Sequence, residues 1–315
     1  SKLYILEGTG TTLSLSSLDG MVNPGSSLTS NVIISSASAS DYIPLSMNKG
    51  ALILDRNVNL DSSSELYKRS EFSSVKVDLT SGNSITGSQS DQTGIAQRNY
   101  ENSSGKDAVK ITNDGSIALT GNNAVGIASD YGHVVNNSTV KTTGEKSVAI
   151  YSANGTTTEN NGEIVIGGNN SAGIYGANYL DGINSSAVLK YGDDKIDISN
   201  NGRIISEGNG KVYGIYADNK YLSRNDSAVR LGSGSNIDLS SSNGGVGIYA
   251  NSTRLTGEGI LSVGNSGVGL YAKDSDVNLN NFTLNLNGDK ALGFYLDGNT
   301  NFTGNGNINI NGNGI

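Results

Sequence analysis

The ionisable residues that could do chemistry in this sequence are few and stand apart from one another. Asp193 and Asp194 form the one acidic doublet, and a pair of carboxylates is what a glycosidase uses for acid and base catalysis. A doublet on a glycine-containing loop is more often a solvated turn. His133 is the single imidazole of the chain, and no acidic residue recurs near it in the sequence. The pattern therefore predicts no catalytic centre, and we expect His133 to have a structural or surface role.

Composition restricts cofactors and partners in the same way. The sequence has no Cys and one His, which excludes disulfides, thiolate metal ligands and zinc sites built from several imidazoles. Lys and Arg number 21 against 29 Asp and Glu, so the net charge is -8 and the pI is near 4.7. Without a basic cluster we expect no nucleic-acid partner. No apolar run approaches the roughly 18 residues of a membrane span, so we expect no membrane contact by this segment. We also expect no cofactor.

Two segments of similar sequence hold the exposed side chains best suited to bind a ligand. Residues 178–199 align with residues 220–240. Both segments interrupt a repeated pattern at the same point, so we expect two loops that leave one edge of the fold side by side. Insertions confined to one face of a repeat protein often form its binding face. The candidate ligand-binding residues are Tyr179, Asp181, Tyr191, Asp193, Asp194, Tyr221, Arg224, Asp226 and Arg230. The alternative is that the loops only cover the sheet edge with their own Tyr and Leu side chains.

The pattern that positions these loops is a repeated phrase that reads VGIYA at 246–250 and VGLYA at 268–272. The phrase recurs with Gly or Ala at one fixed position, occupied by Gly94, Gly126, Ala149, Gly173, Gly214, Gly247, Gly269 and Gly293. The successive intervals are 32, 23, 24, 41, 33, 22 and 24 residues, so the basic period is about 22 to 24 residues. Such a period is typical of a parallel β-helix or a leucine-rich repeat. The LxxLxL frame of leucine-rich repeats is missing, which favours the β-helix.

Each repeat predicts three short strands with the alternation of a half-buried sheet. In the first strand we expect Val246, Ile248 and Ala250 to face the core and Gly247 with Tyr249 to face outward. A second and a third alternating segment follow, separated by Gly and Asn residues that can reach positive φ at tight corners. The sequence thus predicts an all-β fold, a three-sheet parallel β-helix with about 22–24 residues per coil.

A column of tyrosines is the second candidate for a binding surface. One tyrosine follows the glycine by two positions in most repeats, which gives the set Tyr151, Tyr175, Tyr216, Tyr249, Tyr271 and Tyr295. In a parallel β-helix these rings stack at about one strand spacing on the outer surface. Exposed aromatic rows can bind sugar rings or a flat protein partner. Alternatively, each ring covers the adjacent glycine and shields the ladder of hydrogen bonds.

The organisation of the chain follows from where the repeat is regular. We expect residues 1–90 to form irregular early coils of the same β-helix, since the repeated phrase is missing there. Residues 91–315 are predicted to form regular coils with loop insertions near 97–107, 178–195 and 220–236. The last residues, GNGI, begin another repeat, and no capping unit is visible, so we expect a segment of a longer protein.

The repeats resemble a known family of bacterial surface proteins. The segments NNGEIVIGGNNSAGIYG and SNNGRIISEGNGKVYGIYADN, joined to the GIYA phrases, are similar to the passenger repeats of large fusobacterial autotransporter adhesins. The resemblance covers about residues 90–315. It implies a right-handed β-helix, exported through the outer membrane and held at the bacterial cell surface by a C-terminal barrel. It also implies adhesion to host cells, through receptors or glycans, or to other bacteria, but it carries no binding motif to individual residues.

We therefore expect a non-enzymatic, monomeric rod that acts as an adhesin segment. Its expected partners are a host cell-surface receptor or glycan, or the surface of another bacterium. Two alternatives stay open. The coils could be a pure spacer that raises another part of a longer passenger, or they could form a polysaccharide-degrading β-helix in which Asp193 and Asp194 act on an acidic sugar chain.

Overall fold

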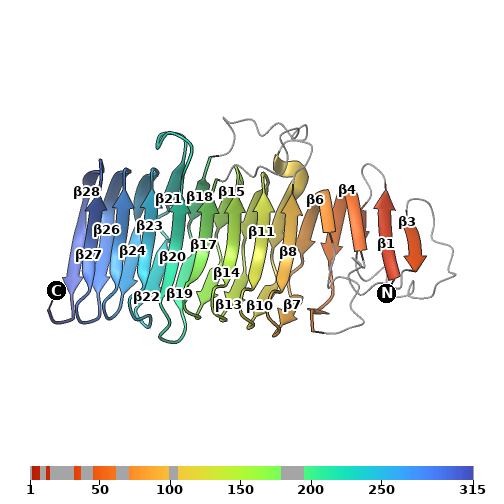
Figure 1. Ribbon diagram of the computed structural model, residues 1–315, viewed down its shortest axis with the longest axis horizontal. Helices are drawn as coiled ribbons and strands as arrows, with labels where there is room; N and C mark the ends of the chain where they lie inside the picture. Colours follow the sequence, from red (N-terminus) through yellow and green to blue (C-terminus); the bar gives the residue numbers. More distant parts are fainter. Residues whose placement is uncertain are drawn as a thin grey trace.

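The computed structural model describes residues 2–7, 12–14, 32–36, 45–61, 71–98, 106–178 and 195–314. Within these residues the chain is a rod of stacked β-strands, with its two termini at opposite ends of the long axis (Figure 1). The helical content of the described part is one short 3-10 helix, η2 (Lys106–Val109). No helix in that part is long and apolar enough to cross a membrane. The predicted all-β class is confirmed.

Three parallel sheets run along the rod, and each coil adds one strand to each sheet. The first sheet contains β8 (Thr93–Arg98), β11 (Val125–Asp130), β14 (Val148–Ala153), β17 (Ser171–Ala177), β20 (Val212–Asp218), β23 (Val246–Asn251), β25 (Val268–Lys273) and β27 (Leu292–Asp297). The second contains β9 (Lys110–Asn113), β12 (His133–Asn136), β15 (Thr157–Asn160), β18 (Asp197–Asn200) and β21 (Ala228–Leu231). The third contains β7 (Ser84–Gly87), β10 (Ser116–Leu119), β13 (Thr139–Thr142), β16 (Glu163–Ile166), β19 (Arg203–Ser206) and β22 (Asn236–Leu239).

In the last three coils the second and third strands merge. β24 (Arg254–Val263), β26 (Asp276–Leu286) and β28 (Asn301–Ile310) each belong to the second sheet with their first half and to the third with their second half. The bend falls at glycines with positive φ, Gly257 (132°) and Gly259 (112°) in β24. Glycine carries no Cβ penalty there, which allows a strand to turn the corner without a loop.

The register between coils confirms the repeat read from the sequence. Ile150 pairs with Ile127 on one side and with Ile174 on the other, and Ile248 pairs with Ile215 and Leu270. All of these side chains have zero solvent exposure. Columns of Ile, Leu and Val from the three sheets therefore fill one narrow core along the rod, as in a three-sheet parallel β-helix.

The glycine of the repeated phrase faces the core, so the predicted alternation of the first strand is wrong at this position. A Cβ on Gly214 would lie 2.8 Å from Cγ2 of the buried Ile237 in the third sheet. The residue before the glycine points outward instead: Tyr213 is half-buried and packs edge-on against Tyr216, with ring centroids 5.2 Å apart. A small residue is needed here because the opposite sheet and the next coil fill the space, and Ala149 occupies the equivalent position in one coil. The tyrosine rings therefore do not serve to cover the glycine.

The predicted left-handed asparagines are found at several corners, since Asn123, Asn154, Asn170 and Asn281 have positive φ. The buried asparagines between the second and third sheets of the earlier coils have a different role. Asn136, Asn160 and Asn200 have no solvent exposure, and none of them has positive φ. The Asn136 Nδ2 donates to Asn160 Oδ1 at 2.8 Å, and the Asn160 Nδ2 donates to Asn200 Oδ1 at 2.7 Å. The corner is therefore stabilised by a buried ladder of side-chain amides, rather than by left-handed backbone.

The strands before β7 are less regular, as the sequence indicates. They are β1 (Lys2–Glu7), β2 (Thr12–Ser14), β3 (Val32–Ser36), β4 (Leu45–Leu54), β5 (Val58–Asn59) and β6 (Glu71–Leu79). β1 pairs antiparallel with β3, while β4 with β6 and β5 with β7 pair in parallel. The parallel pairs carry the core of the regular coils into this region, since Leu52 and Leu54 are fully buried.

Candidate functional site

The three insertions all lie between a first-sheet strand and the next second-sheet strand. They separate β8 from β9, β17 from β18 and β20 from β21. The third insertion is shorter than the predicted 220–236, because β21 begins at Ala228. The other two fall largely at 99–105 and 179–194, outside the described residues. All three therefore leave the rod along one corner, where the loop before β21 projects beyond the strands (Figure 1).

The bases of the second and third insertions lie side by side, as predicted. Asn178 and Asn219 are the last residues of the two coils before the loops, and both are 2 % exposed. Asn178 Nδ2 donates to Asn219 Oδ1 at 2.6 Å, and the Lys220 N–H donates to Asn178 Oδ1 at 2.8 Å. The Asn219 Nδ2 also donates to the Ser252 carbonyl at 2.7 Å. This pair of buried amides fixes the point at which both loops leave the core.

Of the nine predicted ligand-binding residues, four are described. Tyr179, Asp181, Tyr191, Asp193 and Asp194 lie outside the described residues, while Tyr221, Arg224, Asp226 and Arg230 lie within them. Tyr221 is 54 % exposed, compared with 47 % for Tyr295. Asp226 is also exposed. Arg230 is exposed as well, while Arg224 is half-buried.

The two arginines of the site already contact the rod. Arg224 Nη1 lies 3.2 Å from Asp276 Oδ1 and donates to the Asn299 carbonyl at 2.6 Å, so the loop before β21 reaches towards the coils of β26 and β28. Arg230 lies on β21 and donates to Asp197 of the previous coil. A ligand that uses either guanidinium has to share it with these partners. The arginines therefore shape the surface more than they present free charge.

His133 has acidic partners that the local sequence does not show. Its Nδ1 lies 2.7 Å from Asp107 Oδ1 and its Nε2 lies 3.2 Å from Glu159 Oε2, and each carboxylate is 26 residues away on a neighbouring coil. The hydrogen bond from His133 is the main cause that lowers the pKa of Asp107 below its ordinary 3.8. Because both ring nitrogens are engaged, neither can ligate a metal or accept a proton from a substrate without breaking a contact. The expected structural role fits this geometry.

The tyrosine column forms the stacked ladder that the sequence predicts. Centroids of neighbouring rings from Tyr151 to Tyr295 lie 5.4, 5.0, 4.4, 5.2 and 4.7 Å apart, with interplanar angles of 10° to 32°. Burial is the main cause that raises the pKa of Tyr216 and of Tyr249 above the ordinary 10.0. Since each ring face contacts the next ring, the ladder shows mainly ring edges and hydroxyl groups to solvent. A sugar that must stack on a ring face finds little room along it.

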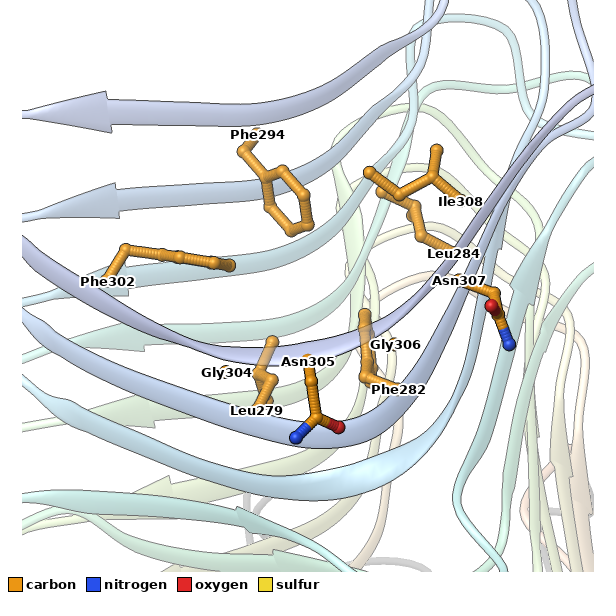
Figure 2. A pocket seen from close by; sticks show the side chains of 10 residues that line it. All are labelled: Leu279, Phe282, Leu284, Phe294, Phe302, Gly304, Asn305, Gly306, Asn307 and Ile308. Carbon is orange, nitrogen blue, oxygen red and sulfur yellow. The ribbon is translucent and has the colours of Figure 1, made fainter.

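A small cavity opens at the C-terminal end of the core. It has a volume of about 130 Å³ and is lined by Leu279, Phe282, Leu284, Phe294, Phe302, Gly304, Asn305, Gly306, Asn307 and Ile308. Figure 2 shows the rings of Phe294 and Phe302 at its mouth, and their centroids lie 4.8 Å apart. Its lining holds no ionisable side chain. The cavity suits an apolar group and supplies no acid, base or metal ligand.

Metal binding finds no support in the described part of the chain. No group of three His, Asp or Glu residues within it is arranged to hold a metal ion. The most strongly perturbed carboxylate is Asp61, whose pKa is lowered from 3.8 to about 2 because the Ser88 hydroxyl, the Ser88 N–H and the Gln92 amide donate to it. These bonds tie one coil to the next, so they have a structural explanation.

These features define a class of protein: a three-sheet parallel β-helix with insertions that start along one corner. A comparison with family models gives the assignment within that class. The chain belongs to the family described as the BigA third pectate lyase-like domain, whose model matches residues 77–293. The match spans the regular coils and the corner that carries the loops. Searches of the curated proteins and of the solved structures found no match.

Proposed function

We propose that this chain is a surface-exposed, non-enzymatic adhesin segment that binds through the loops on one corner of its rod. The observation that carries the proposal is the pairing of the two loop bases through Asn178 and Asn219. It places the starting points of two insertions of similar sequence side by side. Long inserted loops on a rigid scaffold are the usual place for recognition.

The proposed setting is the surface of a bacterial cell, where the rod is held through an outer-membrane barrel of an autotransporter. The match to the BigA third pectate lyase-like domain supports a surface-exposed protein. The barrel of an autotransporter is proposed from the resemblance of the repeats to fusobacterial passengers. The proposed partners are a receptor or glycan of a host cell, or the surface of another bacterium. Tyr221 and Asp226 offer an aromatic ring and a carboxylate for this contact.

Replacement of the loops tests the proposal. Residues 179–194 and 220–226 are each exchanged for a corner of the length found between β23 and β24, while Asn178, Asn219 and Ser227 are kept because they are buried parts of the scaffold. Binding of the wild-type and variant chains to epithelial cells, to partner bacteria and to a glycan array is then compared. Loss of binding with an unchanged thermal transition supports the proposal. Unchanged binding overturns the site and favours the spacer function.

A polysaccharide-degrading function is the second candidate, because the family description contains the words pectate lyase-like. Its proposed catalytic groups are Asp193 and Asp194, which lie outside the described residues. Incubation with acidic polysaccharides, followed by assay of new reducing ends, tests it. Product formation that disappears in the double variant Asp193→Asn and Asp194→Asn establishes this function. No product from the wild-type chain removes it.

A further inference from the structure

Asparagine followed directly by glycine is a repeated dipeptide of this chain. It occurs nine times, and every copy lies within the described residues, at Asn154, Asn161, Asn201, Asn209, Asn243, Asn287, Asn305, Asn311 and Asn313. Such a pair can modify itself in water, because glycine has no side chain to shield its backbone nitrogen, which can attack the carboxamide carbon of the asparagine. The reaction needs an asparagine side chain and a glycine N–H that are both free to react. The hydrogen bonds of each pair therefore decide where it can occur.

In eight of the nine pairs at least one of these two groups is hydrogen-bonded. Gly162, Gly202 and Gly244 donate their N–H groups to carbonyl oxygens of neighbouring coils at 2.8 to 3.0 Å. In five further pairs the carboxamide itself is bonded to a neighbouring coil, namely at Asn154, Asn287, Asn305, Asn311 and Asn313. Attack in these eight pairs requires that a hydrogen bond breaks first, which slows the reaction.

The pair of Asn209 and Gly210 is the exception. It lies at the corner between β19 and β20, on the other side of the first sheet from the inserted loops, and Glu207, Gly208 and Asn209 are all exposed there. Within the described part of the chain, neither the Asn209 carboxamide nor the Gly210 N–H makes a hydrogen bond. Gly208 has a positive φ of 79°, so glycines flank the asparagine on both sides and no adjacent side chain hinders its rotation.

Packing requires that the residue after this asparagine is glycine. A Cβ on Gly210 would lie 2.5 Å from the Gly167 carbonyl oxygen and 3.0 Å from the Asn169 backbone nitrogen. The Ser242 hydroxyl donates to the Gly210 carbonyl at 2.6 Å, and the Lys211 N–H donates to Asn169 Oδ1 at 2.9 Å. The fold thus keeps a glycine at this corner but leaves its N–H unbonded, so the reactive dipeptide is preserved.

We propose that Asn209 is a site of self-modification, at which the chain converts its own carboxamide into a carboxylate. The Gly210 nitrogen loses its proton to water and bonds to the carboxamide carbon, while the bond from that carbon to Nδ2 breaks and Nδ2 leaves as ammonia. Water then opens the succinimide ring that has formed. Opening at the former carboxamide carbon gives aspartate, and opening at the main-chain carbonyl carbon gives isoaspartate. The overall reaction consumes one water and releases one ammonia, and it needs no oxidant or reductant.

The modification changes the charge and the hydrogen bonding of the corner. A carboxylate replaces one neutral amide, so the net charge of the chain changes from -8 to -9. The new charge lies close in sequence to Glu207, which is already paired with Lys141 Nζ at 2.7 Å. In the isoaspartate form the main chain is one carbon longer and the former Asn209 carbonyl belongs to the free carboxylate. That carbonyl accepts from the Asn243 N–H at 3.1 Å, so the contact between these two coils changes.

Peptide mapping of the folded full chain tests the proposal, which does not depend on the loop site. Trypsin cleaves after Lys and Arg, so fragment 204–211 contains Asn209 and no other asparagine, and fragment 196–203 contains Asn201 with the bonded Gly202. After incubation in mildly alkaline water labelled with heavy oxygen, mass spectrometry measures conversion of amide to acid in both fragments. Conversion should be at least about tenfold faster at Asn209 than at Asn201, because the hydrogen bond of Gly202 must break first. Equal rates, or no conversion at Asn209, overturn the proposal.

Two controls separate structure from sequence. In concentrated urea both pairs lose their hydrogen bonds, so the two rates should become similar. A preference for Asn209 that persists in urea would assign the selectivity to neighbouring residues and overturn the structural argument. Asn209→Gln lengthens the side chain so that the five-membered ring cannot form, and it should leave the Tm unchanged because the position is exposed and unbonded. The acidic form that accumulates in the wild type on ion-exchange chromatography should be absent from this variant, and its appearance there would refute the assignment.

Discussion

The buried asparagine ladder gives the sharpest prediction about stability. Asn160 has no solvent exposure, accepts from Asn136 and donates to Asn200. The substitution Asn160→Asp keeps the shape but removes the donor and adds a buried charge. A carboxylate oxygen then faces Asn200 Oδ1, which is an acceptor. A buried acceptor without its donor costs about 1–3 kcal/mol, and an unpaired buried charge raises the total to about 3–5 kcal/mol.

Thermal unfolding followed by circular dichroism measures this cost. For a chain of 315 residues, an unfolding entropy of about 2.1 cal/mol/K per residue converts 3–5 kcal/mol into a Tm decrease of about 5–8 °C. The matched control is the neighbouring exposed ladder, in which Asn161 Nδ2 donates to Asn137 Oδ1 at 3.1 Å. Asn161→Asp should lower the Tm by less than about 1 °C, because water replaces the lost bond.

The pH dependence separates the charge from a packing defect. Burial raises the pKa of an aspartate at position 160. The decrease in Tm relative to wild type is therefore largest at neutral pH, where the carboxylate is charged. It becomes smaller as the pH falls and the carboxyl is protonated, because the acid form can donate to Asn200. Equal Tm values for wild type and Asn160→Asp would refute the ladder as a source of stability. Equal losses for the variants at positions 160 and 161 would refute burial as the cause.

Other close contacts in the structure lead to three more predictions. Gly214→Val should lower the Tm by about 2–5 °C, because the new side chain overlaps Ile237 and overpacking costs about 1–3 kcal/mol. The control is Ala149→Gly at the equivalent position of another coil, which should lower the Tm by less than about 2 °C. The lowered pKa of Asp61 contributes stability that is complete above its ordinary pKa of 3.8 and is lost as the pH falls to about 2, so the Tm difference between wild type and Asp61→Asn should shrink over that window. The raised pKa of Tyr216 favours the neutral phenol, so its contribution to the stability of the fold is complete below pH 10.0 and is lost as the pH rises above that value. Ultraviolet titration should therefore show that some tyrosines ionise only when the chain unfolds in alkali. Ionisation of every tyrosine at its ordinary pKa would contradict the burial of the ladder.

The period of the sequence repeat was enough to predict most of the fold. The phrase around Gly173, Gly214 and Gly247 marks one strand per coil, and in the structure these strands pair in the register that the alignment implies. The stacked tyrosines follow from the same repeat, because residues at one position of each coil must lie one strand spacing apart. Side-by-side loop bases were predictable for this reason too.

Local details were less accessible from the sequence. Strict alternation placed Gly214 outside, but Gly214 and Ile215 both face the core, and only the packing of the third sheet against the first reveals it. Asparagine at a corner suggested positive φ, which holds at Asn154 and Asn281, whereas the buried side-chain amides of Asn136, Asn160 and Asn200 bond between coils instead. The partners of His133 could not be found by inspecting its neighbours, because Asp107 and Glu159 are each about one coil away. Contacts between coils become visible in a sequence only after the register is known.

The central claim is that the corner with the two paired loops binds a cell surface while the coils only present it. The most direct measurement is a titration of the fluorescently labelled chain and of its double-loop variant, with 179–194 and 220–226 shortened, on the same cells. We predict saturable binding of the wild-type chain and none above background for the variant, at equal Tm. Saturable binding of the variant with an unchanged dissociation constant would contradict the claim and leave the coils as a spacer.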